Sequence, residues 1–305
     1  MTAALVLGPI PFNWPAEKWR DYHFRIADEA DVDCVHVGEV VCAKRAPFVA
    51  PYLPDAMARL AAAGKEVVIS TPALVGGERD AAALRELIAD GGLLIEANDI
   101  GAARLLAGRD HAIGPLVNVY NEDTLAFLAA RGAVRVCLPA ELPAASLAAI
   151  AAAAPATVAL ETVVFGRLPL AISARCFHAR AHGLHKDGCR YVCADDPDGL
   201  EVETVEGRPF LAVNGPQTLS HTFADMAGEM HALAECGIRR FRLGPHDCDM
   251  VAVAAVYRGV AAGSLAPDEA GARLRALLPG RAFANGFVHA VAGHRAVRAA
   301  LQLAD

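Results

Sequence analysis

Three cysteines gathered in one polar segment are the residues of this chain best suited to metal chemistry. They are Cys176, Cys189 and Cys193, with 12 residues between the first two and 3 between the last two. A site built from thiolates alone requires four donors, so a fourth must come from elsewhere in the chain. We favour Cys42, because it follows an apolar run at a point where a strand would end and a loop begin. The pattern predicts a four-cysteine metal site.

Disulfide bonds and structural zinc compete with an iron–sulfur centre as explanations for these cysteines. The amino-terminal residues 1–7 lack the basic region and cleavage pattern of a secretory signal, which predicts a reducing, cytoplasmic location and disfavours disulfides. Zinc usually takes cysteine pairs with two residues between them, and the three-residue spacing here leaves zinc and iron–sulfur both open. Free cysteine is commonly a small buried hydrophobe, so we expect core or incidental positions for the others, Cys34, Cys137, Cys236 and Cys248.

The bulk composition is that of an ordinary globular protein. The 305 residues are 54% hydrophobic and 21% charged, enough for one large domain. The formal net charge is −7 and the basic residues are scattered singly, so we expect no nucleic-acid partner. The uncharged stretch 142–160 approaches the length of a bilayer span, but Pro143, Pro155 and many alanines indicate a short buried helix followed by a strand.

Short apolar segments alternate with helical patterns along most of the chain. Eight candidate strands are expected at 5–7, 34–37, 67–70, 93–96, 112–117, 134–138, 158–164 and 241–243. Helices are expected at 55–63, 78–90, 121–131 and 223–236, each followed by glycine. This alternation predicts an α/β fold of the (β/α)8 TIM-barrel type, occupying residues 1–305 as one domain. An open doubly wound sheet is the alternative, although no Gly-x-Gly-x-x-Gly follows the first strand.

The regular alternation breaks once, after the seventh predicted strand. Residues 165–221 contain the cysteine segment, a turn at 195–199, and two strand-like runs at 200–205 and 209–213 that read as a β-hairpin. In a barrel, the loops that follow the strands form the active face. Cys42 follows the second predicted strand, so the insertion and Cys42 are expected on the same face.

The motifs around the cysteines resemble a known family. Residues 161–166, followed by 173–176 and a cysteine pair, are similar to the signature of peptidase family U32, the collagenase-like peptidases. Within that family, residues 38–45 and 168–176 are similar to the UbiV branch. Further likeness at 7–10, 214–218 and 242–245 extends the resemblance over most of the chain.

The resemblance implies an iron–sulfur protein of oxygen-independent ubiquinone biosynthesis. Members of the branch carry a [4Fe–4S] cluster on four cysteines, which match Cys42, Cys176, Cys189 and Cys193 here and favour iron–sulfur over zinc. They form a heterodimer with a homologous UbiU-type subunit and support ring hydroxylation of a prenylated aromatic substrate. A UbiT-type lipid carrier works alongside, and the oxygen atom is thought to come from a prephenate-like donor.

A barrel mouth that binds such a carboxylate donor needs cationic or amide side chains. Three arginines and an asparagine lie at or just past predicted strand ends. Three glutamates also lie at or near strand ends, and these glutamates would act as acid, base or substrate anchor. Salt bridges to Arg45, Arg175 or a lysine are the alternative for the glutamates. The candidate catalytic set is Glu39, Arg45, Asn118, Glu161 and Arg175, with Glu96 and Arg242 as further members of the two groups.

Histidines also occur in the cysteine segment, at His178, His182 and His185. A histidine can replace a thiolate as a cluster ligand, but with four cysteines present we expect these side chains to be exposed or to lie behind the ligands.

Proteolysis is disfavoured despite the family's name. The sequence contains neither Gly-x-Ser-x-Gly nor His-Glu-x-x-His, and cysteines committed to a cluster are poor nucleophiles. Two alternatives to a hydroxylase subunit stay open: an RNA base hydroxylation factor, and a non-catalytic scaffold or electron-transfer subunit of the same complex.

Overall fold

A computed structural model describes residues 3–89 and 91–301, and within them eight parallel strands close into a barrel. Each barrel strand pairs with the next, and β11 pairs with both β7 and β1 to complete the circle. The barrel strands are β1 Ala4–Leu7, β2 Cys34–Val37, β3 Glu66–Ser70, β4 Leu94–Ala97, β5 His111–Ile113, β6 Ala133–Cys137, β7 Ala159–Ile172 and β11 Ile238–Leu243. The predicted (β/α)8 barrel is confirmed.

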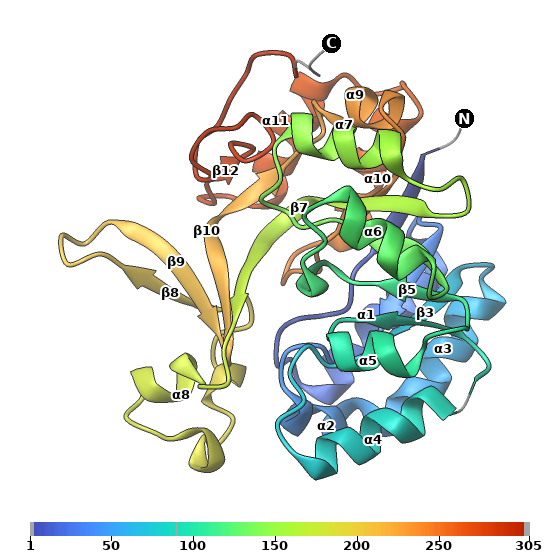
Figure 1. The fold of residues 1–305 in the computed structure, drawn as a ribbon. Coiled ribbons are helices and arrows are strands. Elements are labelled where there is room, and N and C mark those ends of the chain that lie inside the picture. The colour runs from blue at the N-terminus through green and yellow to red at the C-terminus, as the bar shows by residue number, and fades with distance from the viewer. Residues whose placement is uncertain (1–2, 90, 302–305) are drawn as a thin grey trace.

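Helices connect the strands and cover the outside of the barrel (Figure 1). Their apolar faces pack on the strands in one large core that includes Leu5, Leu60 and Phe241, each fully buried. The helices are α1 Ala16–Glu29, α2 Ala46–Val49, α3 Leu53–Ala62, α4 Glu78–Ala89, α5 Ile100–Leu105, α6 Glu122–Ala129, α7 Ala144–Ala153, α8 Phe177–Ala181, α9 Met230–Glu235, α10 Met250–Ala261 and α11 Pro267–Leu277. Short 3-10 turns are η1 Ala43–Arg45, η2 Ala50–Tyr52, η3 Pro115–Val117, η4 Lys186–Gly188 and η5 Val192–Ala194.

The seventh strand leaves the barrel and continues outward as an arm (Figure 1). Up to Phe165, β7 pairs with β11, and from there to Ile172 it pairs antiparallel with β10, Gln217–Asp225. Gly166 lies at the change of partner with φ +106°, and a Cβ there would lie 2.9 Å from His246 Nε2. Glycine is therefore required where the strand departs.

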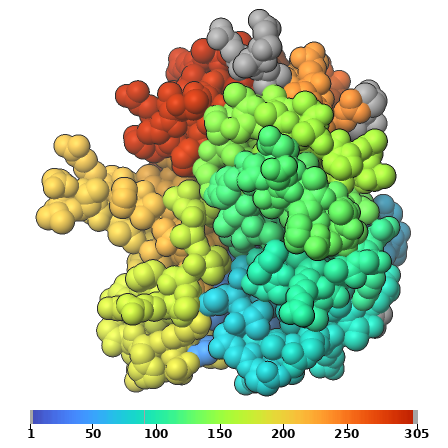
Figure 2. All heavy atoms as spheres, viewed as in Figure 1, coloured from blue at the N-terminus to red at the C-terminus, as the bar shows by residue number. Residues whose placement is uncertain are grey.

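The arm carries the predicted insertion. A hairpin of β8 Leu200–Glu203 and β9 Pro209–Asn214 extends the sheet beyond the first half of β10. The short strand β12 Phe283–Ala284 pairs with the second half of β10, at Phe223 and Ala224. The cysteine segment follows β7 and forms a small lobe alongside the amino-terminal half of the barrel (Figures 1 and 2). The insertion and its hairpin after the seventh strand are confirmed, and the assignment of residues 1–305 to one domain stays a prediction.

Several predicted elements are wrong in their bounds, among them the strand expected at 158–164, which continues to Ile172 as β7. The helix expected at 223–236 shrinks to α9, because Phe223 and Ala224 are buried in β10 between β7 and β12. The strand expected to reach Val117 ends at Ile113, because Gly114 and Pro115 begin the turn η3. Residues 142–160 form α7 and the start of β7, as predicted, whereas Asp90 lies outside the described residues. No helix within the described ranges is long and apolar enough to cross a bilayer.

A buried ionic network fills the barrel interior. Arg242 on β11 donates to Glu161 on β7 and to Glu96 on β4, and these two carboxylates are 2% and 0% exposed. Ser70 Oγ donates to Glu96 Oε2 at 2.7 Å. Burial opposes ionisation of Glu96, but the charge of Arg242 outweighs it and holds the pKa of Glu96 well below its usual range.

We expect Arg242→Leu to lower the free energy of unfolding by about 3–5 kcal/mol at pH 7, because Glu96 loses its arginine and Glu161 keeps only the longer contact to Arg240, at 3.4 Å. Without Arg242, burial would raise the pKa of Glu96 above its unfolded value, so the loss should shrink as the pH falls from 7 towards 5. Urea unfolding at both pH values measures this. Arg273→Leu, which removes a 58% exposed partner of Glu269, should cost under about 0.5 kcal/mol. An Arg242 loss that does not change with pH would contradict this account.

Candidate metal centre

The loop after β2 presents Cys42 towards the insertion. Gly38 has φ +118°, and a Cβ there would lie 2.5 Å from the Ser70 carbonyl oxygen, so the chain turns sharply as it leaves the strand. Glu39 Oε1 then accepts the backbone N–H groups of Val41 and Cys42, at 2.8 and 2.9 Å. A carboxylate that binds two successive amides fixes the loop that carries Cys42.

The cysteine segment folds as α8 and two 3-10 turns. Cys176 caps α8, where its Sγ accepts from Ala179 N–H at 3.4 Å, and Cys193 lies in η5 after two left-handed residues, Arg190 and Tyr191. Lys44 ties this segment to the Cys42 loop, because its Nζ donates to Lys186 O at 2.8 Å and to Asp187 Oδ1 at 2.9 Å.

All four predicted ligands line one small cavity. Cys42, Cys176, Cys189 and Cys193 form its walls together with Lys44, Arg45 and Gly215. Cys176 and Cys193 are buried, while Cys42 and Cys189 are half-buried. The remaining cysteines lie elsewhere: Cys34 and Cys137 are buried barrel residues, and Cys236 and Cys248 are half-buried. The fold therefore brings together residues that are 151 positions apart in the chain, from Cys42 to Cys193.

Arg45 is the buried charged residue among the walls of this cavity, and it is only 2% exposed. Its Nη1 donates to Pro11 O at 2.8 Å and its Nη2 donates to Asn214 Oδ1 at 2.9 Å, while its buried Nε has no hydrogen-bond partner. Burial raises the pKa of the Cys42 and Cys193 thiols, and the nearby charge of Arg45 acts in the opposite direction. The buried guanidinium would thus stabilise these sulfurs in the deprotonated form that binds metals.

The spacing of the four cysteine sulfurs can be compared with the spacing of ligands around one zinc ion. A tetrahedral zinc with bonds of about 2.3 Å sets its sulfurs about 3.8 Å apart. Over residues 3–89 and 91–301, one group of three or more His, Cys, Asp or Glu side chains has its ligand atoms within 4.8 Å of one another, and it contains no cysteine. The cysteine sulfurs are therefore spread more widely than one zinc ion requires. N–H groups directed at sulfur, from Ala179 and from Asn13 Nδ2 at 3.6 Å, are of the kind that tunes iron–sulfur clusters.

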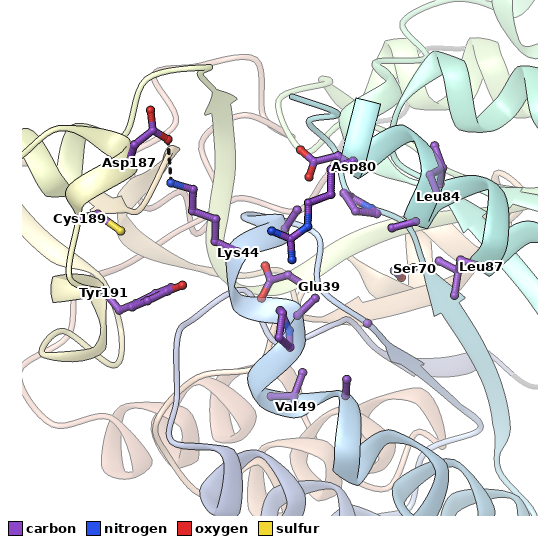
Figure 3. Close-up of a pocket in the computed structure, with 18 of the residues that line it drawn as sticks. Glu39, Lys44, Val49, Ser70, Asp80, Leu84, Leu87, Asp187, Cys189 and Tyr191 are labelled. Atoms are coloured by element: carbon purple, nitrogen blue, oxygen red, sulfur yellow. Dashed lines mark hydrogen bonds and ion pairs between the residues drawn. The ribbon is translucent and has the colours of Figure 1, made fainter. Parts of the chain in front are cut away.

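A second, much larger cavity of about 1100 Å³ adjoins the cysteines (Figure 3). It lies between the loop and helices after β2, helix α4 and the cysteine segment. Cys189 and Tyr191 form one side, and Glu39, Lys44, Arg79 and Asp80 supply charged groups. The other walls are mainly apolar: Val49, Leu53, Ile69, Leu84, Leu87 and Leu184. Ser70, which donates to Glu96 of the barrel network, also lines this cavity.

The candidate catalytic residues fall into three places. Glu39 lines the large cavity and Arg45 lines the cysteine cavity. Glu161 lies inside the barrel and pairs with Arg242 and Arg240, so its salt bridge is to neither of the expected arginines. Asn118 and Arg175 are exposed and belong to the walls of neither cavity. A catalytic role for any of the five stays a prediction.

Sequence reasoning missed the apolar cavity and the loop-fixing contacts of Glu39. The cavity walls come from three separated segments whose apolar residues resemble ordinary core residues in a sequence. The signal for Glu39 was local, because a carboxylate two or three residues before two free amides is a common loop-capping arrangement.

Two solved structures are similar to this chain at low identity. One, titled "The Structure of the U32 Peptidase Mk0906", is 14% identical with a TM-score of 0.44, covering 80% of this chain and 94% of its own. The other is a family GH18 chitinase from Cycas revoluta in complex with allosamidin, 12% identical with a TM-score of 0.39, covering 86% of this chain and 99% of its own. The sequence model of peptidase family U32 matches residues 20–295. The chain therefore belongs to peptidase family U32.

Proposed function

We propose that this protein is the iron–sulfur subunit of an oxygen-independent hydroxylase of a ubiquinone precursor, acting with a homologous UbiU-type subunit. The observation that carries the proposal is the set of four cysteines around one cavity, in the positions that match the UbiV branch of the family. The cofactor would be a [4Fe–4S] cluster held by Cys42, Cys176, Cys189 and Cys193.

The proposed cluster would transfer electrons, because four thiolates leave no iron site open to substrate. The chain's own residues have supporting roles. Arg45 provides a buried positive charge next to the proposed thiolates, Glu39 fixes the Cys42 loop, and Lys44 ties that loop to the cysteine segment. The Lys44 contacts resist separation of the two parts of the chain that supply ligands.

The large cavity is suited to a prenylated aromatic substrate. Its volume of about 1100 Å³ is at the upper end of the usual range for small-molecule sites, about 300–1000 Å³. Leucine and valine side chains suit an isoprenoid tail, and Lys44 and Arg79 could pair with a carboxylate on the aromatic ring or on a prephenate-like oxygen donor. Cys189 belongs to both cavities, so a ring bound there would lie beside the proposed cluster.

Exposed apolar residues on the arm support a partner subunit. Val205 and Phe210 are 102% and 59% exposed on the β8–β9 hairpin, which projects from the barrel (Figure 1). Exposed apolar side chains of this size are typical of protein interfaces. We assign this hairpin to contact with the homologous subunit; the UbiT-type carrier would then deliver substrate to the assembled pair.

Anaerobically purified protein should be brown and contain about four irons per chain. Cys193→Ala should lose these irons, because three thiolates hold the cluster poorly. Elemental analysis and visible absorption measure this. Cys236→Ala is the matched control and should keep full iron content, because Cys236 follows α9, does not line the cysteine cavity, and donates its thiol to Leu233 O. A colourless protein with one zinc on these cysteines would refute the cluster.

An anaerobic hydroxylation assay tests the function itself. The purified pair should convert the prenylated precursor, and both the partner alone and the pair carrying Cys193→Ala should lose activity by at least about a hundredfold. Full activity of the partner alone would instead identify this chain as a scaffold. An inactive pair, together with loss of one modified RNA nucleotide on gene deletion, would favour the RNA hydroxylation alternative.

Substitution in the large cavity should discriminate between substrates by their tails. Leu87→Gln should raise KM about tenfold or more for the prenylated substrate and leave a tail-less analogue within about twofold, because burying a leucine is worth about 1.5–3 kcal/mol. Steady-state kinetics of the pair measure this. Leu105→Gln, at a leucine that is 45% exposed on α5, is the control. An equal change in KM for both substrates would place the tail elsewhere.

A further inference from the structure

Two histidines and an aspartate of the cysteine segment converge at a point that the cluster ligands do not occupy. His178 and His182 lie four residues apart, on α8 and just after it, and Asp196 follows η5. One ligand atom from each lies within 4.8 Å of the other two, and the imidazole rings are parallel within 8° at 5.6 Å between centroids. Two histidines with this spacing on one helix face are an established arrangement for binding one metal ion.

The tautomer of His178 leaves one ring nitrogen free to bind a cation. His178 is fully buried, and its Nδ1 lies 3.2 Å from the backbone carbonyl oxygen of Val213. A carbonyl oxygen only accepts, so Nδ1 carries the proton and Nε2 keeps its lone pair. Histidines that bind metals usually donate their other N–H to a carbonyl or carboxylate in this way.

The environment of Nε2 lacks a hydrogen-bond donor. Nε2 is buried without a hydrogen-bond partner, although it lies 2.9 Å from Asp196 Oδ2. The distance fits an ion pair, but with the ring proton on Nδ1 the Nε2 atom has no hydrogen to donate to that oxygen. A lone pair and a carboxylate oxygen at this separation repel each other unless a cation lies between them.

We propose that His178, His182 and Asp196 bind one divalent transition-metal ion, such as Zn²⁺, in a site separate from the four cysteines. Imidazole and carboxylate are suitable ligands for such ions, and three protein ligands leave at least one position for water or an external ligand. His178 also lines the cysteine cavity, so the ion lies immediately beside it. The ion joins α8 to the chain after Cys193.

This site is independent of the proposed hydroxylase function. It needs no electron donor, no partner and no particular substrate, and its ligands include no cysteine. A protein whose cysteines hold zinc, or hold nothing, would still bind this ion.

Equilibrium dialysis of the full chain against buffered free Zn²⁺, followed by elemental analysis, tests the site. Wild-type protein should bind one zinc per chain more than His182→Ala and Asp196→Asn, whose affinity for that zinc should fall at least about a hundredfold. Both residues lie at or near the surface, so the variants should fold. The controls, His231→Ala and Asp195→Asn, replace an exposed histidine paired with Glu235 and the exposed neighbour of Asp196, and should bind as wild type does.

Two further readouts locate the ion. Iron content should be the same in all five proteins, and the zinc absorption edge of the wild type minus that of Asp196→Asn should show nitrogen and oxygen neighbours. Equal zinc in wild type and variants, or sulfur neighbours in the difference, would overturn the proposal. Loss of iron together with zinc in His182→Ala would also overturn it, because that histidine would then serve the cysteine centre.

Discussion

The buried guanidinium of Arg45 connects three parts of the chain that are far apart in sequence. It follows Cys42 by three residues, donates to the carbonyl of Pro11 after β1, and donates to Asn214 at the end of β9 in the arm. Asn214 Nδ2 reaches the same Pro11 carbonyl, which closes the contact. Gly215 completes it, since a Cβ there would lie 2.7 Å from Arg45 Nη2. This contact sets the barrel mouth against the arm, and the cysteine cavity depends on that placement.

Two buried arginines, Arg242 and Arg45, differ in the charge of their hydrogen-bond partners. Arg242 and Arg240 face the two carboxylates Glu96 and Glu161 inside the barrel, so that network neutralises its own charge. Arg45 is bonded to neutral oxygens and keeps one N–H unused beside the thiols. A buried cation with no carboxylate in hydrogen bond contact needs a negative partner. The charge of Glu39 meets part of that need through space, and the proposed thiolates of the cysteine cavity would meet the rest.

Much of the fold was predictable from the sequence, because the barrel strands are short apolar runs and glycine marks several helix ends. The strand β10 was not, since its alternating residues 217–225 become a strand only by pairing with the extended β7. The cysteine set was predictable from residue type and spacing. The partner of Glu161 was not, because Arg242 is 81 residues away and local sequence carries no signal for the pair. The large cavity was hidden for the same reason, as its walls meet only in the folded chain.

The 14-residue strand β7 serves as a barrel stave in its first half and as the root of the arm in its second. The cysteine segment is therefore attached to the barrel through a continuous β-strand, not through a flexible linker. Any movement of the arm relative to the barrel requires a change in the short stretch of backbone around Gly166. The lobe that carries Cys176, Cys189 and Cys193 is therefore held in place relative to the barrel mouth, so a ligand could enter or leave the neighbouring large cavity without displacing these cysteines.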